Sequence, residues 1–439
     1  TGAYVTISGV SGNPGGVPDA EINIEHEVVR IDADNFSITV TTAATSTTSA
    51  QGGTGISIAC QINPGFASTT AGYGWGVGEW SGDYGWGLSS PEAIALLQRD
   101  WFFDNFDNDL VMNIRKGEIY YWERGSLSNP STALGTRAVL LSSLTGATDV
   151  PNVAMQTLVS QNDRHLLAFG CQPFAGSATD YDPLLIRWAS QDEPQVWGPT
   201  TVNSAGFLRV SRGSEIVRAF PTRQETLVWT NSNLYALQYV GTTDVFALQE
   251  LADNISIISP RAVASANNTV YWMGAEKFYA YNGQVQTLPC TVRDYVFKDI
   301  NVFQADQIVS GSNEGFTEIW WFYPSAASNW NDRYVIYNYL EGIWYYGTIV
   351  RTAWLDSALR GKPLACSTLQ GATSGNLFSH EVGVNDDTVA MESFIQSADF
   401  DLGDGYKFML TDRLIPDFKF EGSTATNPSL TMTIKPKRF

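Results

Sequence analysis

Short runs in which apolar and polar residues alternate cover most of this chain, and turn-forming residues separate them. Near the start the runs are Tyr4–Ile7, Glu27–Ile31 and Phe36–Val40, with SGNPGG at 11–16 and DADN at 32–35 between them. A period of two places successive side chains on opposite faces of a strand. Residues 1–48 are therefore predicted to form a small antiparallel β domain.

Pairs of apolar runs then recur around tight turns along the rest of the chain. The units cover residues 109–122, 165–190, 226–241, 269–283, 318–349 and, in a weaker sixth copy, 363–381. Their spacing of about 40 to 60 residues is close to the period of propeller blades. An isolated hairpin is marginally stable in water, so each unit needs neighbours that cover its faces. The pattern predicts an all-β fold with a β-propeller over residues 90–390, and a Greek-key sandwich is the alternative.

Aromatic residues are abundant in these units, at 13% of the chain. In a ring of sheets, large apolar side chains fill the space between neighbouring blades. We expect this role for Trp229, Tyr235, Tyr271, Trp272, Phe278, Tyr279, Trp320, Trp321 and Trp344.

One helix is predicted at the start of the propeller. Ser90 is a suitable N-cap, Pro91 suits the first helical position, and Glu92 places an acid in the first turn. Apolar residues at helical spacing follow as far as Trp101, so the helix is expected to end between Trp101 and Asn105.

Residues 49–89 read as a Thr/Ser linker followed by a tract of glycine and tryptophan. Trp75, Trp80 and Trp86 stand among many glycines, which give the backbone freedom but no packing volume. Such a tract cannot build its own core. We expect its tryptophans, with Trp101, to be packing or interface residues that fill pockets on the propeller or on a neighbouring subunit.

The charge balance excludes one class of function. The chain has 26 basic and 45 acidic residues, a formal net charge of −19. Tight non-specific binding of DNA needs many Lys and Arg contacts to phosphate, and this sequence has the opposite sign. The basic cluster at 435–438 reads as a solvated terminus. No apolar run is long enough to span a bilayer. The chain opens within a patterned run, so we expect a mature or partial product that lacks an N-terminal segment.

No motif for catalysis, a cofactor or a metal is found in the sequence. The four cysteines and three histidines are scattered, and no phosphate-binding loop, dinucleotide fingerprint or nucleophile elbow is present. The cysteines are read as mostly buried free thiols. Asp399, Asp401 and Asp404 resemble the front of a calcium loop, but Asp404 and Leu410 occupy the positions of the required Gly and Glu. An Asp-rich turn is the simpler interpretation there, as it is for Asp104, Asp107 and Asp109.

Several segments resemble the tail nozzle (tail tubular, or tail-hub stabilisation) proteins of short-tailed bacteriophages. These are the run from Trp101 to Trp122, the Gly-Trp tract before it, and the segment from Glu392 to Phe418. The N-terminal segment is similar to a small β domain of many phage virion proteins. The segment from about residue 130 to 260 departs most from these proteins, and its assignment to the propeller depends on the strand pattern alone.

The resemblance implies a six-bladed propeller whose six copies form a ring at the distal end of the tail. It implies contacts with a head-to-tail adaptor protein and with tail fibres or spikes, and genomic DNA as passing cargo. Location in the virion, no cofactor and no enzymatic activity follow from it. Residues 391–439 are expected to close the propeller or to contact a neighbour.

A carbohydrate-active or carbohydrate-binding propeller is the alternative. Ser81–Gly85 resembles the start of the Asp-box of sialidase propellers, although Leu88 stands where its closing aromatic belongs. A sialidase-like site would also need an arginine cluster, an acid and a tyrosine nucleophile.

Overall fold

The computed structural model divides the chain into two compact units, Thr1–Val382 and Gly383–Phe439. It describes residues 3–32, 35–47, 52–60, 68–69, 98–124, 138–177, 180–241, 244–356, 361–368, 375–383, 385–386, 389–390, 412–413, 415, 417–423 and 426–435.

The N-terminal β domain is a four-stranded antiparallel sheet. Its strands stand in the order β3-β2-β1-β4 and are β1 (Ala3–Ser8), β2 (Glu25–Arg30), β3 (Phe36–Ile38) and β4 (Ser57–Cys60), with η1 (Pro14–Gly16) and α1 (Asp19–Ile22) between the first two. Val5, Ile7, Val10 and Val28 form its core. The sheet thus confirms the predicted β domain.

The predicted boundary at residue 48 is wrong, because β4 lies beyond it. The described part of the segment between β3 and β4 is a loop that is hydrogen-bonded to the domain. The Glu21 carboxylate accepts hydrogen bonds from the Thr42 hydroxyl and from the backbone N–H groups of Thr42 and Thr41, and these bonds hold the pKa of Glu21 below its usual value. The alternation of apolar and polar residues predicts strands β1 to β3, whereas the four residues SIAC at 57–60 are too few to show such a pattern.

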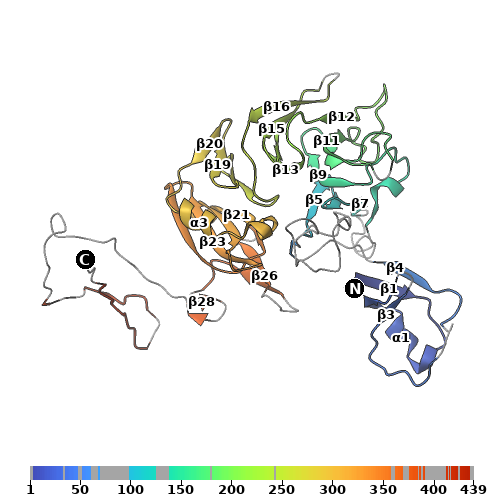
Figure 1. Ribbon diagram of the computed structural model, residues 1–439, viewed down its shortest axis with the longest axis horizontal. Helices are drawn as coiled ribbons and strands as arrows, with labels where there is room; N and C mark the ends of the chain where they lie inside the picture. The colour runs from blue at the N-terminus through green and yellow to red at the C-terminus, as the bar shows by residue number, and fades with distance from the viewer. Residues whose placement is uncertain are drawn as a thin grey trace, which may run out of the picture. The chain divides into compact units, whose positions relative to one another are not determined.

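Six further antiparallel sheets follow in chain order and form a six-bladed propeller-like core (Figure 1). Blade 1 contains β5 (Trp101–Phe106), β6 (Asp109–Ile114), β7 (Ile119–Trp122) and β8 (Val139–Leu140). Blade 2 contains β9 (Ala154–Ser160), β10 (His165–Cys171), β11 (Asp182–Trp188) and β12 (Gly206–Arg209). Blade 3 contains β13 (Ile216–Pro221), β14 (Thr226–Thr230), β15 (Leu234–Tyr239) and β16 (Phe246–Ala252).

The last three blades repeat the arrangement. Blade 4 contains β17 (Val263–Ala266), β18 (Thr269–Met273), β19 (Phe278–Tyr281) and β20 (Val285–Leu288). Blade 5 contains β21 (Val309–Asn313), β22 (Glu318–Pro324), β23 (Asn331–Asn338) and β24 (Ile343–Thr348). Blade 6 contains β25 (Ala353–Leu355), β26 (Leu364–Thr368) and β27 (Gly375–Ser379). Short helices are η3 (Leu141–Ser143), α3 (Arg293–Asp299), η4 (Val302–Gln307) and η5 (Glu314–Phe316).

Local sequence explains the hairpins. Asn267 and Asn268, between β17 and β18, both have positive φ, of 49° and 59°, which a two-residue type I′ hairpin requires and asparagine tolerates. The first strand of each blade lies innermost, since β5 contacts β9, β9 contacts β13, β17 contacts β21 and β21 contacts β25. We call the end of the propeller at which these inner strands begin the start face.

Residues 90–97 of the predicted helix lie outside the described residues, and from residue 98 onward the prediction is wrong. Trp101–Phe106 is strand β5, which pairs with β6 from Trp101↔Ile114 to Phe106↔Asp109. Burial alternates along it, with Phe102 and Phe106 buried. The apolar residues suit either period over so short a run, and pairing with the neighbouring hairpin decides for the strand.

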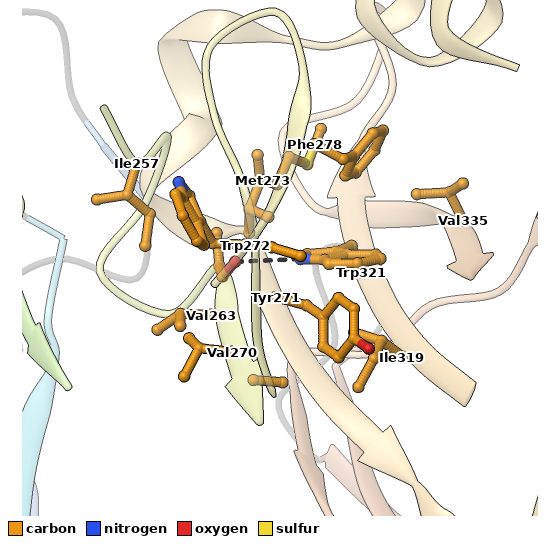
Figure 2. Packing of buried hydrophobic residues seen from close by; sticks show 14 of the residues in the cluster. Ile257, Val263, Val270, Tyr271, Trp272, Met273, Phe278, Ile319, Trp321 and Val335 are labelled. Carbon is orange, nitrogen blue, oxygen red and sulfur yellow. Dashed lines mark hydrogen bonds between the residues drawn. The ribbon is translucent and has the colours of Figure 1, made fainter. Parts of the chain in front are cut away.

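Aromatic side chains fill the spaces between blades, as the sequence pattern predicts. Trp229 of blade 3 packs edge-on against Trp272 of blade 4, with ring centroids 5.3 Å apart. The Trp321 indole N–H of blade 5 donates to the Ala262 carbonyl, which lies just before β17, at 3.1 Å (Figure 2). Trp229, Trp272 and Trp321 are fully buried. Of the residues expected there, Tyr279 and Trp320 are only half-buried.

Buried polar side chains join neighbouring blades as well. Asn113 of blade 1 accepts from the Thr157 backbone N–H of blade 2 at 2.9 Å. Gln156 of blade 2 donates to the Ala219 carbonyl of blade 3 at 2.7 Å and accepts from its N–H at 2.8 Å. These bonds give the buried amides hydrogen-bond partners and fix the position of one inner strand relative to the next.

We expect the protein to lose stability as the pH falls below about 6.5, the usual pKa of histidine. His165 is buried between Tyr239 and Phe246, and burial lowers its pKa. The unfolded chain therefore binds a proton that the folded chain excludes, so stability is lost towards acid pH. His165→Leu should show a smaller fall in Tm between pH 7.5 and pH 5 than the parent, by calorimetry.

An unchanged pH dependence in His165→Leu would show that His165 does not carry the effect.

The C-terminal unit contains the short strands β28 (Asn385–Asp386) and β29 (Val389–Ala390), which pair with each other. In the described residues after 411 no further helix or strand occurs, and the large apolar side chains are exposed; these are Ile415, Phe418, Phe420, Leu430, Met432 and Ile434.

Candidate functional site

Side chains from opposite blades meet on the start face. Arg261, which lies just before β17, donates from Nε to the Asp100 Oδ1 at 3.0 Å and from Nη2 to the same oxygen at 2.9 Å. It also donates to the Trp101 carbonyl. Blades 1 and 4 stand three apart in a ring of six, so this contact crosses the propeller axis.

A second ion pair lies on the same face. Arg115, at the end of β6, contacts the Asp306 carboxylate at 2.8 Å, and both side chains are mostly buried. Its backbone N–H donates to the Asp100 carbonyl at 2.9 Å. Asp306 precedes the inner strand of blade 5. The two pairs therefore join the beginnings of three inner strands and obstruct the axis at this end.

Arg218 completes the cluster of arginines. Its guanidinium carbon lies 5.2 Å from the centre of the Phe102 ring, and that of Arg261 lies 4.8 Å from it. Burial, with Arg261 as the second cause, lowers the pKa of Arg218 to about 9. Because a guanidinium stays protonated near neutral pH, the shift expresses the cost of burying its charge. Asp104 lies on the same inner strand as Phe102, and burial raises its pKa.

The residues that flank the Gly-Trp tract both bind on the start face. The Thr69 N–H donates to the Gln304 side-chain oxygen at 3.0 Å, and the Gln304 amide donates to the Thr69 carbonyl at 2.7 Å. Gln304 and Asp306 belong to η4. Asp100 is held beside Arg115 and Arg261, so residues 69 and 100 are both bound on this face.

A cavity of about 470 Å³ lies at the opposite end, between blades 1 and 2. It is lined by Phe106, Asp107, Asp109, Tyr121, Leu144, Thr145, Arg164, Asp192, Pro194 and Gln195. Tyr121 donates its hydroxyl proton to Asp109, and burial raises the pKa of Tyr121. Arg164 pairs with Asp192 and lies 4.0 Å from Asp107. The cavity is therefore lined by aromatic and carboxylate groups, and its tyrosine hydroxyl and arginine are already paired with neighbouring carboxylates.

The structure places the predicted site residues as follows. Trp101 begins β5, half-buried, and its carbonyl binds Arg261. Asp107 has a φ of 60° in the β5–β6 turn, which confirms a polar turn at this residue. The same prediction is wrong for Asp104 and Asp109, which lie in strands β5 and β6. Trp75, Trp80, Trp86, Asp399, Asp401 and Asp404 lie outside the described residues.

Sequence reasoning missed the pairs of Arg115 and Arg261. Each joins residues more than 150 positions apart, and no local spacing marks such a pair.

Over the residues that the structure describes, no group of three or more His, Cys, Asp or Glu side chains is placed to hold a metal ion. Cys171, Cys290 and Cys366 are free thiols, as predicted, but of these three only Cys171 is buried, whereas Cys290 is half-buried and Cys366 is exposed. The expectation that the cysteines are mostly buried is therefore wrong for two of the three. Burial raises the pKa of Cys171 to about 12 and that of Cys290 to about 11, so both stay protonated. Within the described part, no helix is long and apolar enough to cross a membrane.

The fold defines the class of the protein, an all-β, six-bladed propeller-like protein with a small N-terminal β domain. No family model and no curated protein matches the chain.

Several solved structures have limited similarity to it. The extracellular domain of a protein described as a one-component system from B. thetaiotaomicron has 10% identity and a TM-score of 0.39, over 67% of this chain and 33% of that one. The designed Ika8 protein has 10% identity and a TM-score of 0.37, over 64% of this chain and 72% of that one. Apo AztD from Citrobacter koseri has 6% identity and a TM-score of 0.34, over 62% of this chain and 69% of that one. The chain thus spans 33% of the first of these proteins. These likenesses assign no function.

Proposed function

We propose that the protein is a structural subunit of a phage tail nozzle, a ring that conducts DNA and carries fibres or spikes. The observation that carries the proposal is the apolar surface on the outer strand of blade 5. Tyr346 of β24 is exposed and packs against the exposed Tyr295 of α3, with ring centroids 4.4 Å apart. Ile343 and Tyr345, on the other face of the same strand, are exposed as well. Exposed aromatic pairs of this kind are typical of protein interfaces.

The ion-paired axis supports one detail of this proposal. Arg115 and Arg261 obstruct the propeller axis at the start face. A path for DNA would therefore run between subunits, through the lumen of the ring, and not through one propeller. The net charge of −19 suits a lumen that lets DNA slide. The resemblance of residues 101–122 and 392–418 to nozzle proteins supports the same assignment.

The protein is expected to form a homohexamer with interfaces larger than about 2,000 Å² per pair. Light scattering of the purified chain and labelled antibodies on virions measure this directly. Tyr346→Asp should weaken the ring, because it places a charge in the apolar surface, whereas Arg209→Asp, on blade 2, is the control. A chain that stays monomeric, with no ring in the particle, would rule out the proposal.

We expect only weak binding to DNA, with little dependence on salt. A protein that neutralises many phosphates loses affinity steeply as salt rises, whereas this acidic chain makes few such contacts. Filter binding between 50 and 200 mM salt measures the slope. Affinity tighter than about 1 µM with a steep slope would show a basic patch that the net charge conceals.

A carbohydrate-binding propeller is the second candidate, and the cavity between blades 1 and 2 favours it. Tyr121 and Phe106 supply aromatic surface, and Asp109 supplies a hydrogen-bond acceptor. A glycan array separates the two candidates: binding that Tyr121→Ala abolishes, by a monomeric chain, would support the carbohydrate function.

A further inference from the structure

The sixth blade differs from the other five in its number of strands. Blades 1 to 5 have four strands each, whereas blade 6 has three, β25-β26-β27, in the part of the chain that the structure describes. Strand β27 pairs with β26 from Gly375↔Thr368 to Ser379↔Leu364, and in that part it has no partner on its other side. Leu377, in its middle, is 68% exposed. An unpaired edge of this kind is a template for another strand.

A segment with the sequence of a strand, but with no sheet, lies near the C-terminus. From Pro428 to Lys435 the chain reads PSLTMTIK, in which Leu430, Met432 and Ile434 alternate with threonines. The three apolar side chains are 53%, 51% and 62% exposed. Period-two alternation with β-branched residues is typical of a strand with one buried face. We call residues 428–435 the C-terminal arm.

We propose that the C-terminal arm of one copy adds to β27 of a neighbouring copy as the fourth strand of its sixth blade. The inference rests on the proposed ring. Main-chain hydrogen bonds along the edge would supply affinity, and the alternate side chains would supply specificity. Strand addition would give blade 6 the four strands of blades 1 to 5 and would cover Leu377.

A second copy is the occupant that the dimensions and symmetry favour. The arm has eight residues, and the outer strands β16 and β24 have seven and six. Every copy carries one arm and one open edge, so each subunit donates once and accepts once. Such head-to-tail contacts close into a ring when the rotation between subunits is a whole fraction of a turn.

Charge substitutions in the full-length chain test the contact. Met432→Asp places a carboxylate on the apolar face of the arm, and Thr431→Asp places the same charge on the other face. We expect Met432→Asp to weaken association about tenfold or more, while Thr431→Asp changes it much less. Both should leave the thermal melting of the propeller unchanged. Equal association by the parent and Met432→Asp would overturn the inference.

Disulfide trapping identifies which chain supplies the strand. Cys366 pairs with Leu377 across β26 and β27, so it is first replaced in Cys366→Ser. One preparation then carries Leu377→Cys, and a second carries Leu430→Cys, Met432→Cys or Ile434→Cys. After mixing and oxidation, we expect a linked pair with one chain of each kind from at least one of the three, and none from Thr431→Cys or Thr433→Cys, since only one face can approach Leu377.

Each other outcome is decisive. If the disulfide forms only within a single chain that carries both cysteines, the arm closes its own propeller and the inference is wrong. If rings form but no link appears at any position, the inference falls and the proposed nozzle stands. If no ring forms, the proposed function fails, and the link between two copies still decides the inference, because strand exchange does not need a closed ring.

Discussion

Arg187→Ala is expected to lower the free energy of unfolding by about 3–5 kcal/mol, the usual cost of removing one partner of a buried ion pair. Arg187 lies on β11 and is 1% exposed. It donates to the carbonyls of Gln172 at 3.0 Å, Asp149 at 2.8 Å and Trp197 at 3.3 Å, and it pairs with the Asp149 carboxylate. Alanine leaves these acceptors without their donor in the interior of blade 2.

The matched control is Arg209→Ala, on the neighbouring strand β12. Arg209 pairs with Asp182 at 2.7 Å, but more than half of its side chain is exposed. Exposed pairs contribute little because water screens them and the side chains lose freedom. Urea denaturation of both variants measures the difference. Similar midpoints for the two variants would show that burial does not give the Arg187 pair its importance.

Trp272→Ala is expected to cost about 3–5 kcal/mol, through lost burial and the cavity that remains between blades. Trp272 is fully buried, packs edge-on against Trp229 and stacks on Tyr279 with centroids 5.3 Å apart. Phe303→Ala is the control, because Phe303 is 84% exposed, and surface changes are usually within about 0.5 kcal/mol. Urea denaturation measures both.

Phenylalanine substitutions separate packing from hydrogen bonding at the same site. The Trp321 indole N–H donates to the Ala262 carbonyl, whereas the Trp272 indole N–H has no partner in the structure. Trp321→Phe should therefore cost about 0.5–1.5 kcal/mol more than Trp272→Phe. Equal costs would mean that the bond of Trp321 contributes nothing beyond its packing.

Much less of the candidate site than of the fold could be predicted from the sequence. Turn positions such as Asp107 follow from local chemistry, since Asp and Asn favour turns. The pairing of Arg261 with Asp100 does not, because the two residues are far apart in sequence and meet across the axis only when the blades assemble around it. The tryptophans of the Gly-Trp tract and the aspartates at 399–404 stay predictions.

The sequence by itself determined that the chain forms hairpins with period-two burial and that most of its aromatics pack between sheets. Both features depend on residues that are close in sequence, so the alternation of apolar and polar residues and the turn residues predict them directly. Only the tertiary structure decided that Trp101–Phe106 is a strand, that Ser57–Cys60 completes the N-terminal sheet, and that arginines meet on the axis. Each of these outcomes depends on which distant segments the closing sheets bring together, and a short run of residues is compatible with more than one partner until that closure occurs.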